Sequence, residues 1–216
     1  MKVFVLHYSF LTERKSFMLK QFKDHNITDY DFIELYDVKD IEEIYKKRFD
    51  KISLGSASLS LKHYNAYERI ATDKEYDEAL ILEDDAILCD GFMDKLKLYL
   101  TQVPKDYDMV FLGDGCNLHI PKEYQTDNLY VYRKGLEPTI WGGEGCSRCT
   151  DSYIVSKKCA KKLTYLLNKM EEKIRDPNDF FLNVLARWAK LNVYWVEPTI
   201  VTQGSMSGLF TQSYKY

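Results

Sequence analysis

The sequence predicts one α/β domain, in which helices cover a sheet, and three observations support this fold class. Two continuous apolar runs, residues 79–82 and 109–112, lead into acidic residues, as expected for strands buried on both faces. Segments with apolar residues at every third or fourth position alternate with such runs, which is typical of helices packed on a sheet. The 216 residues contain no repeat, low-complexity tract or linker, so one domain over residues 1–216 is expected.

Composition and charge exclude several classes of protein. The chain has 30 basic and 33 acidic residues, a net charge of −3, so no nucleic-acid surface is expected. No apolar run approaches the ~20 residues of a membrane span. The first apolar run turns polar at His7, too soon for the core of a signal peptide. The chain is therefore expected to be cytoplasmic, or to be a domain of a larger or viral protein.

The N-terminal part predicts a strand, a helix and a second strand. The apolar residues 3–6 indicate the first strand of the sheet. A helix is expected from Thr12, which is a plausible N-cap residue. Arg14 falls in the first turn of this helix, directly after a strand end, where a guanidinium could reach a phosphate. Residues 31–36 alternate polar and apolar like a strand with one wet face, and residues 40–49 resemble a short charged helix.

The middle of the chain predicts two helices and one irregular segment. A loop over residues 55–58 is expected to precede a helix over residues 59–72. His63 lies on the apolar side of that helix, where a lone histidine is usually a core residue. Residues 91–100 predict another helix, with apolar residues on one face. Residues 115–150 show little periodicity, which in a compact domain often marks a functional lid.

The C-terminal part alternates strands and helices again. Residues 153–155 indicate a short strand, and residues 157–170 predict a helix with its leucines inward. A further helix begins near Pro177, a residue that suits a first turn. Residues 192–201 indicate a last strand, in which Pro198 implies an edge position or a bend.

The five cysteines do not indicate a disulfide framework, because their number is odd. Cys146 and Cys149 form a lone C-x-x-C motif, and no second motif completes a four-ligand zinc site. The glycines at positions 142, 143 and 145 place this motif in a loop. We expect these two cysteines to be reduced. Outside the cytosol they could form a local disulfide with each other.

Three consecutive acids, Glu83, Asp84 and Asp85, follow the apolar run of residues 79–82. Carboxylates at the carboxyl end of a buried strand lie where open α/β sheets bind ligands. Adjacent negative charges repel one another, and their hard oxygen ligands suit Mg²⁺ or Mn²⁺. A solvated acidic turn is the alternative, but the apolar residues on both sides favour a metal site that carries a diphosphate.

Six segments of the chain follow one another in the order and spacing that are typical of one known family. They are Arg14, Gly55 to His63, Leu82–Glu83–Asp84–Asp85, Thr150 to Lys158, Pro177–Asn178–Asp179 and Glu197–Pro198. Together they resemble glycosyltransferase family 25, which includes lipopolysaccharide glycosyltransferases and the galactosyltransferase domains that modify collagen hydroxylysine. The resemblance runs through some 190 residues, and the L-E-D-D stretch is similar to the signature that follows a strand in the family.

The resemblance implies a GT-A-like fold, a mixed sheet flanked by helices, and a UDP-sugar donor. Mn²⁺ or Mg²⁺ would be held by Asp85, with Glu83 as a further ligand or a ribose contact. A third ligand near the C-terminus is often a histidine in such enzymes; here Gln203, Ser205 or water would take that place. The resemblance also implies donor-binding roles for six residues: Arg14, Gly55, His63, Glu83, Asp84 and Gln203.

The family is described as inverting, which implies that a carboxylate takes the proton of the acceptor hydroxyl. Asp179 is the first candidate for this base, Asp151 the second and Asp114 the third. An acid at a helix start, favoured by the helix dipole, is the structural alternative for Asp179. The implied acceptor is a carbohydrate or a glycosylated protein: a glycan, a lipopolysaccharide or a hydroxylysine-type hydroxyl.

Three other functions remain open from the sequence. A retaining GT-A transferase would share the metal site, and a nucleotidyltransferase could also use acids at strand ends, although no glycine-rich phosphate loop is present. The third is a catalytically degenerate GT-A fold that serves as a nucleotide-sugar or partner-binding module. Three departures from the family pattern around the His63 helix favour it: Ser58 and Leu59 replace glycine and cysteine, and Lys62 replaces serine. The intact acids at 83–85 and 179 speak against it, and His7 is a further departure, in place of asparagine or leucine.

Overall fold

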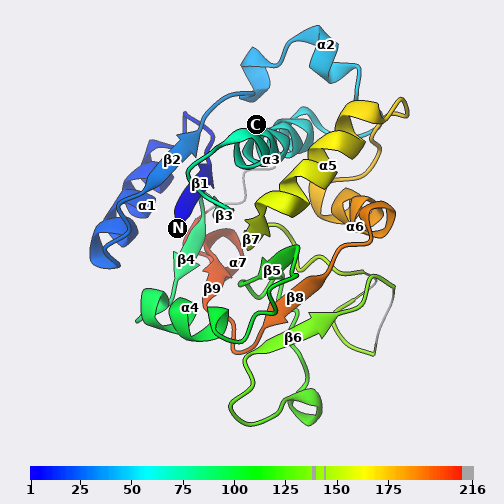
Figure 1. The fold of residues 1–216 in the computed structure, drawn as a ribbon. Helices are drawn as coiled ribbons and strands as arrows, with labels where there is room; N and C mark the ends of the chain where they lie inside the picture. Colours follow the sequence, from blue (N-terminus) through cyan, green and yellow to red (C-terminus); the bar gives the residue numbers. More distant parts are fainter. Residues whose placement is uncertain (138–139, 144, 211–216) are drawn as a thin grey trace.

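A seven-stranded mixed sheet runs through the molecule in the order β2–β1–β3–β7–β5–β8–β6 (Figure 1). The computed structural model describes residues 1–137, 140–143 and 145–210. The strands of this sheet are β1 (Lys2–Leu6), β2 (Tyr30–Ile33), β3 (Glu78–Glu83), β5 (Met109–Phe111), β6 (Val131–Lys134), β7 (Ser152–Ser156) and β8 (Val193–Val196). Strand β1 pairs in parallel with β2 and β3, whereas β7 runs antiparallel to both of its neighbours, β3 and β5.

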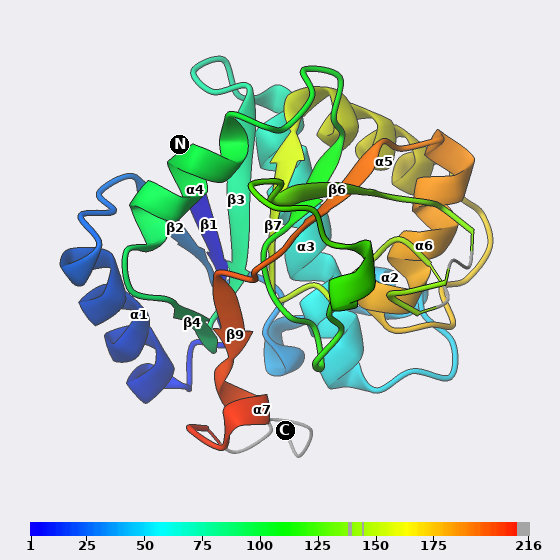
Figure 2. The ribbon, with the colours of Figure 1, turned by 90° about the horizontal axis from the view of Figure 1, so that it is seen from below.

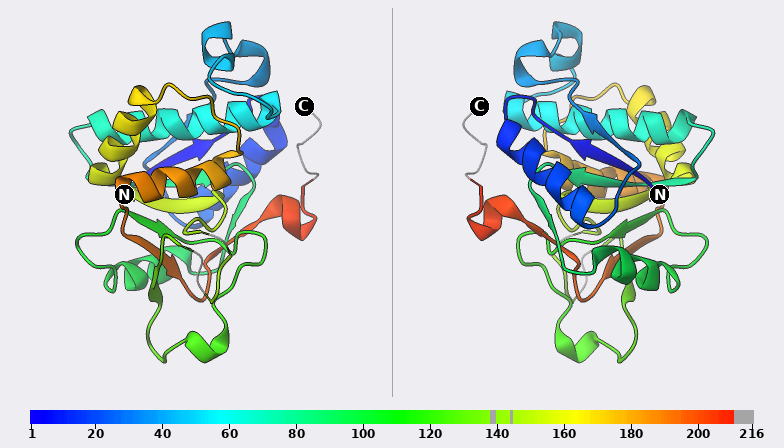
Figure 3. Two further views of the ribbon diagram at one scale, coloured as in Figure 1. Left: turned by 90° about the vertical axis from the view of Figure 1, so that its right-hand side faces the viewer. Right: turned by 90° about the vertical axis from the view of Figure 1, so that its left-hand side faces the viewer.

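Helices cover both faces of the sheet, which confirms the predicted fold class. Helices α3, α5 and α6 share one hydrophobic cluster on one face, while α1 and α4 share a second cluster on the other face (Figure 3). The helices are α1 (Thr12–Asp24), α2 (Glu43–Lys46), α3 (Leu54–Thr72), α4 (Phe92–Leu100), α5 (Lys157–Lys169), α6 (Asn178–Ala189) and α7 (Gly204–Ser207), with short 3₁₀ turns at Val38–Asp40 and Lys122–Tyr124.

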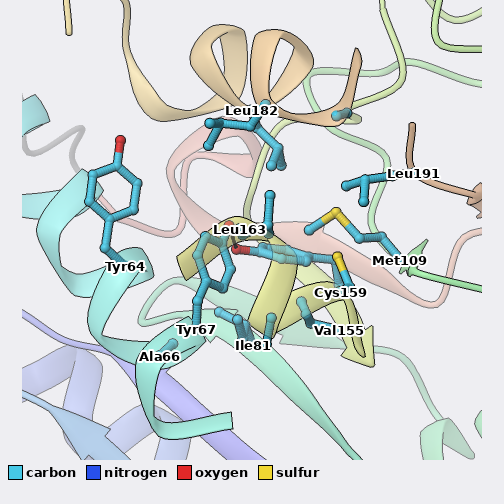
Figure 4. Close-up of a cluster of buried hydrophobic side chains, with 14 of the residues drawn as sticks. Tyr64, Ala66, Tyr67, Ile81, Met109, Val155, Cys159, Leu163, Leu182 and Leu191 are labelled. Carbon is cyan, nitrogen blue, oxygen red and sulfur yellow. Dashed lines mark hydrogen bonds between the residues drawn. The ribbon is translucent and has the colours of Figure 1, made fainter. Parts of the chain in front are cut away.

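Successive side chains of each strand point to opposite faces of the sheet, so each strand contributes residues to both clusters. In β3, Ile81 faces the α3 side of the sheet, whereas Leu80 and Leu82 face the α1 side. Figure 4 shows the first cluster, in which Tyr67 of α3, Leu163 of α5 and other side chains of these helices gather over the sheet. Burial of this kind contributes roughly 1.5–3 kcal/mol for each large apolar side chain, so both faces hold the strands in register.

The register of the sheet places the acidic residues together. Leu6 pairs with Glu83 at the carboxyl ends of β1 and β3. Because β7 runs antiparallel, its amino end meets the same edge, where Leu82 pairs with Ser152. The residues that follow β1 and β3 and those that precede β7 therefore lie at one edge of the sheet, which is where open α/β sheets bind ligands.

A small second sheet brings the C-terminal segment to this edge. Strand β4 (Ala86–Leu88) pairs antiparallel with β9 (Val201–Gln203), so that Ala86 lies opposite Gln203 (Figure 2). The short helix α7 follows β9 directly. The acidic stretch after β3 is thus covered by residues more than a hundred positions away in the sequence.

Several local expectations differ from the structure. Helix α3 begins at Leu54, earlier than expected, because Ser53 Oγ accepts a hydrogen bond of 3.1 Å from the Ser56 backbone and caps the helix. Thr12 is the first residue of α1 and makes no side-chain cap, since Leu11 occupies the N-cap position. The single strand expected over 192–201 is two strands with Pro198 between them. Strand β6 lies within the segment expected to be irregular.

Among the residues that the structure describes, no helix has the length and apolar character that crossing a membrane requires.

Candidate functional site

Two adjoining cavities open at the carboxyl edge of the sheet. The first, which we call the α3 pocket, has a volume of about 160 Å³ and lies between the end of β1 and the start of α3; its walls include Leu6, Leu11, Val38, Ser56, Ser58 and Lys62. The second, the acidic cleft, has a volume of about 340 Å³; it is lined by residues that include Glu83, Asp85, Cys116, Cys149, Asp179, Phe180, Gln203 and Ser205. Arg14, Ser56, Leu59 and Glu83 line both cavities.

Asp84 uses both of its carboxylate oxygens inside the protein. Its Oδ1 accepts a hydrogen bond of 2.8 Å from Arg14 Nη1, and its Oδ2 lies 2.8 Å from His7 Nδ1. The backbone N–H of Tyr8 also donates to Oδ2, at 3.2 Å. Asp84 therefore ties the exit of β1 and helix α1 to the exit of β3. It lines the α3 pocket, but these bonds favour a positioning role over the direct donor contact expected from the sequence.

Asp85 joins the acidic stretch to the C-terminal segment. Its Oδ2 accepts a hydrogen bond of 3.1 Å from the Ser205 backbone, and its backbone oxygen accepts one of 2.7 Å from Gly204. The other carboxylate oxygen, Oδ1, is buried and has no hydrogen-bond partner. A buried carboxylate oxygen without a partner is costly unless a cation satisfies it, so this side chain fits a metal ligand.

Glu83 lies at the junction of the two cavities. Its Oε1 accepts a hydrogen bond of 3.1 Å from Thr150 Oγ1. Burial, together with the negative charges of Asp85 and Asp151, raises the pKa of Glu83 well above its usual value of 4.5. A bound cation would offset this repulsion. Within the described residues, no three His, Cys, Asp or Glu side chains form a ready metal site, so water and phosphate oxygens would complete the shell, as they usually do for Mg²⁺.

Asp151, the second candidate base, lies beneath the cleft and does not line it. It is fully buried, with Oδ2 accepting a hydrogen bond of 2.7 Å from Ser152 Oγ and Oδ1 without a partner. Burial is the main cause that raises its pKa to about 7, with Asp114 and Asp85 adding to it. A Cβ atom at Gly113 would come within 2.0 Å of this carboxylate. The close backbone approach therefore excludes an acceptor sugar from Asp151.

Asp179 lies in the first turn of α6 and lines the acidic cleft. Burial raises the pKa of this carboxyl above its usual value of 3.8, although hydrogen bonds from the backbone of Phe180 and of Asp179 itself oppose that shift. Its backbone oxygen accepts a hydrogen bond of 2.8 Å from Ser147 Oγ, which fixes the start of the helix. Phe180 beside it is 62% exposed and also lines the cleft.

The remaining expected donor residues divide between the cavity walls and the core. Gly55 lies in the first turn of α3 and lines the α3 pocket, and Gln203 lines the acidic cleft. His63 is fully buried and lines neither cavity. Its Nδ1 lies 2.7 Å from the Tyr153 hydroxyl and its Nε2 lies 3.8 Å from Glu83 Oε1. Burial lowers the pKa of His63 to about 3, so it is neutral, and any donor-binding role would act through Glu83.

Sequence reasoning missed a buried ion pair beside the α3 pocket. Lys62 Nζ lies 2.7 Å from Asp37 Oδ1, and both side chains are buried. Lys62 also donates to the backbone oxygen of Leu35, and Ser9 donates to Asp37. The position of Lys62 on the apolar face of a helix indicates that it needs a buried partner. Nothing in the sequence nearby indicates that this partner is Asp37.

The chain also matches known proteins. The model of glycosyltransferase family 25, described as a lipopolysaccharide biosynthesis protein family, matches residues 1–182. The chain belongs to glycosyltransferase family 25. This confirms the resemblance.

Two further comparisons show proteins that are similar to this family 25 chain. A protein of Acanthamoeba polyphaga mimivirus that is named as a glycosyltransferase is 28% identical in an alignment of 120 residues, and the match covers 52% of this chain and 37% of that protein. The match thus spans about a third of the viral protein. The crystal structure of the galactosyltransferase LgtC with donor and acceptor sugar analogues superposes with a TM-score of 0.50 at 11% identity, covering 94% of this chain and 86% of LgtC. This similarity supports the GT-A-like fold.

Proposed function

We propose that this protein is a metal-dependent glycosyltransferase that moves a sugar from a UDP-sugar to an acceptor hydroxyl with inversion. One observation carries the proposal: the α3 pocket and the acidic cleft adjoin and share Arg14 and Glu83. A nucleotide sugar divides in the same way, into a nucleoside, a charged diphosphate and a sugar. The nucleoside would occupy the α3 pocket, the diphosphate would lie where Arg14 and Glu83 line both cavities, and the sugar would occupy the acidic cleft.

The α3 pocket has the chemistry of a nucleoside site. Leu6, Leu11 and Val38 provide apolar walls, while Ser58 and Lys62 add polar groups. Small-molecule pockets are usually built this way, with a few polar groups that fix orientation. Arg14 lines both cavities, where its guanidinium can lie near a phosphate while it also holds Asp84.

Asp85 and Glu83 are the residues that would hold Mn²⁺ or Mg²⁺ here. When bound, the ion supplies Lewis-acid stabilisation of the leaving diphosphate. Asp85 offers the buried oxygen that lacks a partner, and Glu83 sits where the two cavities meet. Gln203 and Ser205 line the same cleft from the C-terminal segment and are polar candidates for further contacts.

Asp179 is the proposed catalytic base. The acceptor hydroxyl oxygen forms a bond with the anomeric carbon, the bond from that carbon to the diphosphate breaks, and the Asp179 carboxylate takes the hydroxyl proton. A carboxylate with a raised pKa is a stronger base, which suits this step. Asp151 is too deeply buried to contact an acceptor, and Asp114 remains the further candidate.

A carbohydrate acceptor fits the open end of the acidic cleft. The exposed ring of Phe180 lies next to Asp179, and an aromatic face beside polar side chains can pack on the apolar face of a sugar ring. We propose this side for the acceptor, whether it is a glycan, a lipopolysaccharide or a glycosylated protein. Lys62, one of the departures that favoured a degenerate module, is accounted for by its ion pair with Asp37.

The experiment is a transfer assay with a panel of UDP-sugars and aryl glycosides, with Mn²⁺ and with a chelator. We expect UDP release and a glycosylated product only with the metal, and NMR of the product should show an inverted anomeric configuration. A retained configuration would remove the need for Asp179 as base. Donor binding without any transfer or donor hydrolysis would instead favour the binding module.

A further inference from the structure

Two cysteine thiols face each other on the wall of the acidic cleft. Cys149 Sγ lies 3.6 Å from Cys116 Sγ, although the two residues are 33 positions apart in the sequence. Both residues line the cleft that also contains Glu83, Asp85 and Asp179. The site proposed above uses neither thiol.

We propose that Cys116 and Cys149 form a reversible disulfide, and that a small disulfide such as glutathione disulfide is the oxidant. A disulfide needs its sulfurs about 2.05 Å apart, so the bond requires the two side chains to approach from 3.6 Å. Both residues lie outside helices and strands. A modest movement of these loop residues can therefore close the bond without disturbing the sheet.

The other cysteines are poorly placed to compete. Cys146, the motif partner of Cys149, is 1% exposed and packs in the core on the α3 side of the sheet. Burial raises the pKa of Cys146 to about 12, so little thiolate is present there. Cys159 is fully buried in α5, and Cys89 is near Lys95, next to α4. The fold thus pairs Cys149 with Cys116 instead of with its neighbour in the C-x-x-C motif.

Exposure sets the order of the chemical steps. Cys116 is exposed, so its thiolate attacks the glutathione disulfide, forms a mixed disulfide and releases one glutathione. Cys149 is only partly exposed, and burial with the neighbouring Cys116 raises the pKa of its thiol. It then loses its proton and attacks the Cys116 sulfur, which releases the second glutathione. One disulfide is reduced to two thiols while the protein dithiol is oxidised.

The bond would join two segments of the cleft wall. Asp114 lies two residues before Cys116, and Thr150, which follows Cys149, donates to Glu83. The closed loop would contain β6 and the 3₁₀ turn at Lys122–Tyr124. This proposal does not depend on the transferase proposal, because it concerns only the thiols.

The experiment equilibrates the whole chain in glutathione buffers of increasing oxidised fraction, blocks free thiols with an alkylating agent and maps the peptides. In the wild type we expect loss of two thiols and a cross-linked peptide pair that contains residues 116 and 149. The oxidised protein should melt roughly 5–15 °C higher than the reduced protein, as expected for a loop of this length.

Matched variants separate this site from general thiol oxidation. Cys89→Ser should keep both the cross-link and the rise in Tm. Cys116→Ser and Cys149→Ser should lose both, and Cys149→Ser should accumulate a mixed disulfide at Cys116. A cross-link between Cys146 and Cys149, or mixed disulfides on the wild type without any cross-link, would overturn the proposal.

Discussion

Arg14 Nη1 donates a hydrogen bond of 2.8 Å to Asp84 Oδ1, and this contact is buried on both sides. It connects the first turn of α1 with the residue that follows β3 and belongs to the acidic stretch. The middle acid of that stretch is therefore held by a cation of the protein itself, which leaves Glu83 and Asp85 on either side of it to face the acidic cleft.

We expect Asp84→Asn to destabilise the fold by about 3–5 kcal/mol, because it removes the carboxylate from a buried pair. Urea unfolding measures the free energy of unfolding. The matched control is Asp24→Asn, which removes an exposed pair with Lys20 and should change little. Equal effects of the two substitutions would contradict the structural role of Asp84.

The pair of Lys62 and Asp37 predicts an acid dependence of stability. Burial acts to raise the pKa of Asp37, but hydrogen bonds from Lys62 and Ser9 outweigh it and hold that pKa below the usual 3.8. A carboxyl whose pKa is lower in the folded state contributes stability above the unfolded value, and this is lost as the pH falls through the folded value.

The wild type should therefore lose more free energy of unfolding than Asp37→Asn when the pH is lowered from about 5 to about 2. Lys62→Met alone should destabilise strongly, because it leaves Asp37 buried without its cation. The double variant Lys62→Met with Asp37→Leu should recover much of that loss. If Asp37→Asn shows the same acid dependence as the wild type, the pair is not formed in solution.

Asp179→Asn should reduce sugar transfer by about 10²–10⁴-fold while UDP and Mn²⁺ still bind, because only the base is removed. The acid limb of the pH–rate profile should disappear with it. Asp176→Asn is the control, since Asp176 is exposed on the loop just before α6 and does not line the cleft. Near-normal turnover of Asp179→Asn would move the role of catalytic base to Asp114.

The sequence was sufficient for the fold class because periodicity and buried runs are local signals. The strands around residues 79–83 and 109–111 and helices α4, α5 and α6 follow from their apolar patterns. Errors arose where a single side chain decided the boundary. Ser53 extends α3 by one turn through its capping bond, which moves Gly55 from a loop into a helix.

The site was only partly accessible from the sequence because its contacts are long-range. The acids at the end of β3 were visible as a motif. Which of them is held inside the protein depends, however, on His7, which follows β1, and on Arg14 of α1. The same holds for the cysteines, since Cys149 has a sequence neighbour at Cys146 but faces Cys116. The C-x-x-C spacing does not reveal this contact, because Cys116 and Cys149 meet only in the folded chain.

The effect of Asp85→Asn on metal-dependent UDP binding tests the proposed metal site most directly. Asparagine can still accept the hydrogen bond from the Ser205 backbone through its amide oxygen, so the fold should persist. UDP with Mn²⁺ at 100 times its Kd should stabilise the wild type by about 2.7 kcal/mol. The exposed control Asp94→Asn should behave as the wild type does.

In this thermal-shift measurement we expect Asp85→Asn to keep a melting temperature close to that of the wild type but to lose the Mn²⁺-dependent shift with UDP. If Asp85→Asn binds UDP and Mn²⁺ as tightly as the wild type, the metal site lies elsewhere and Asp85 is not a metal ligand.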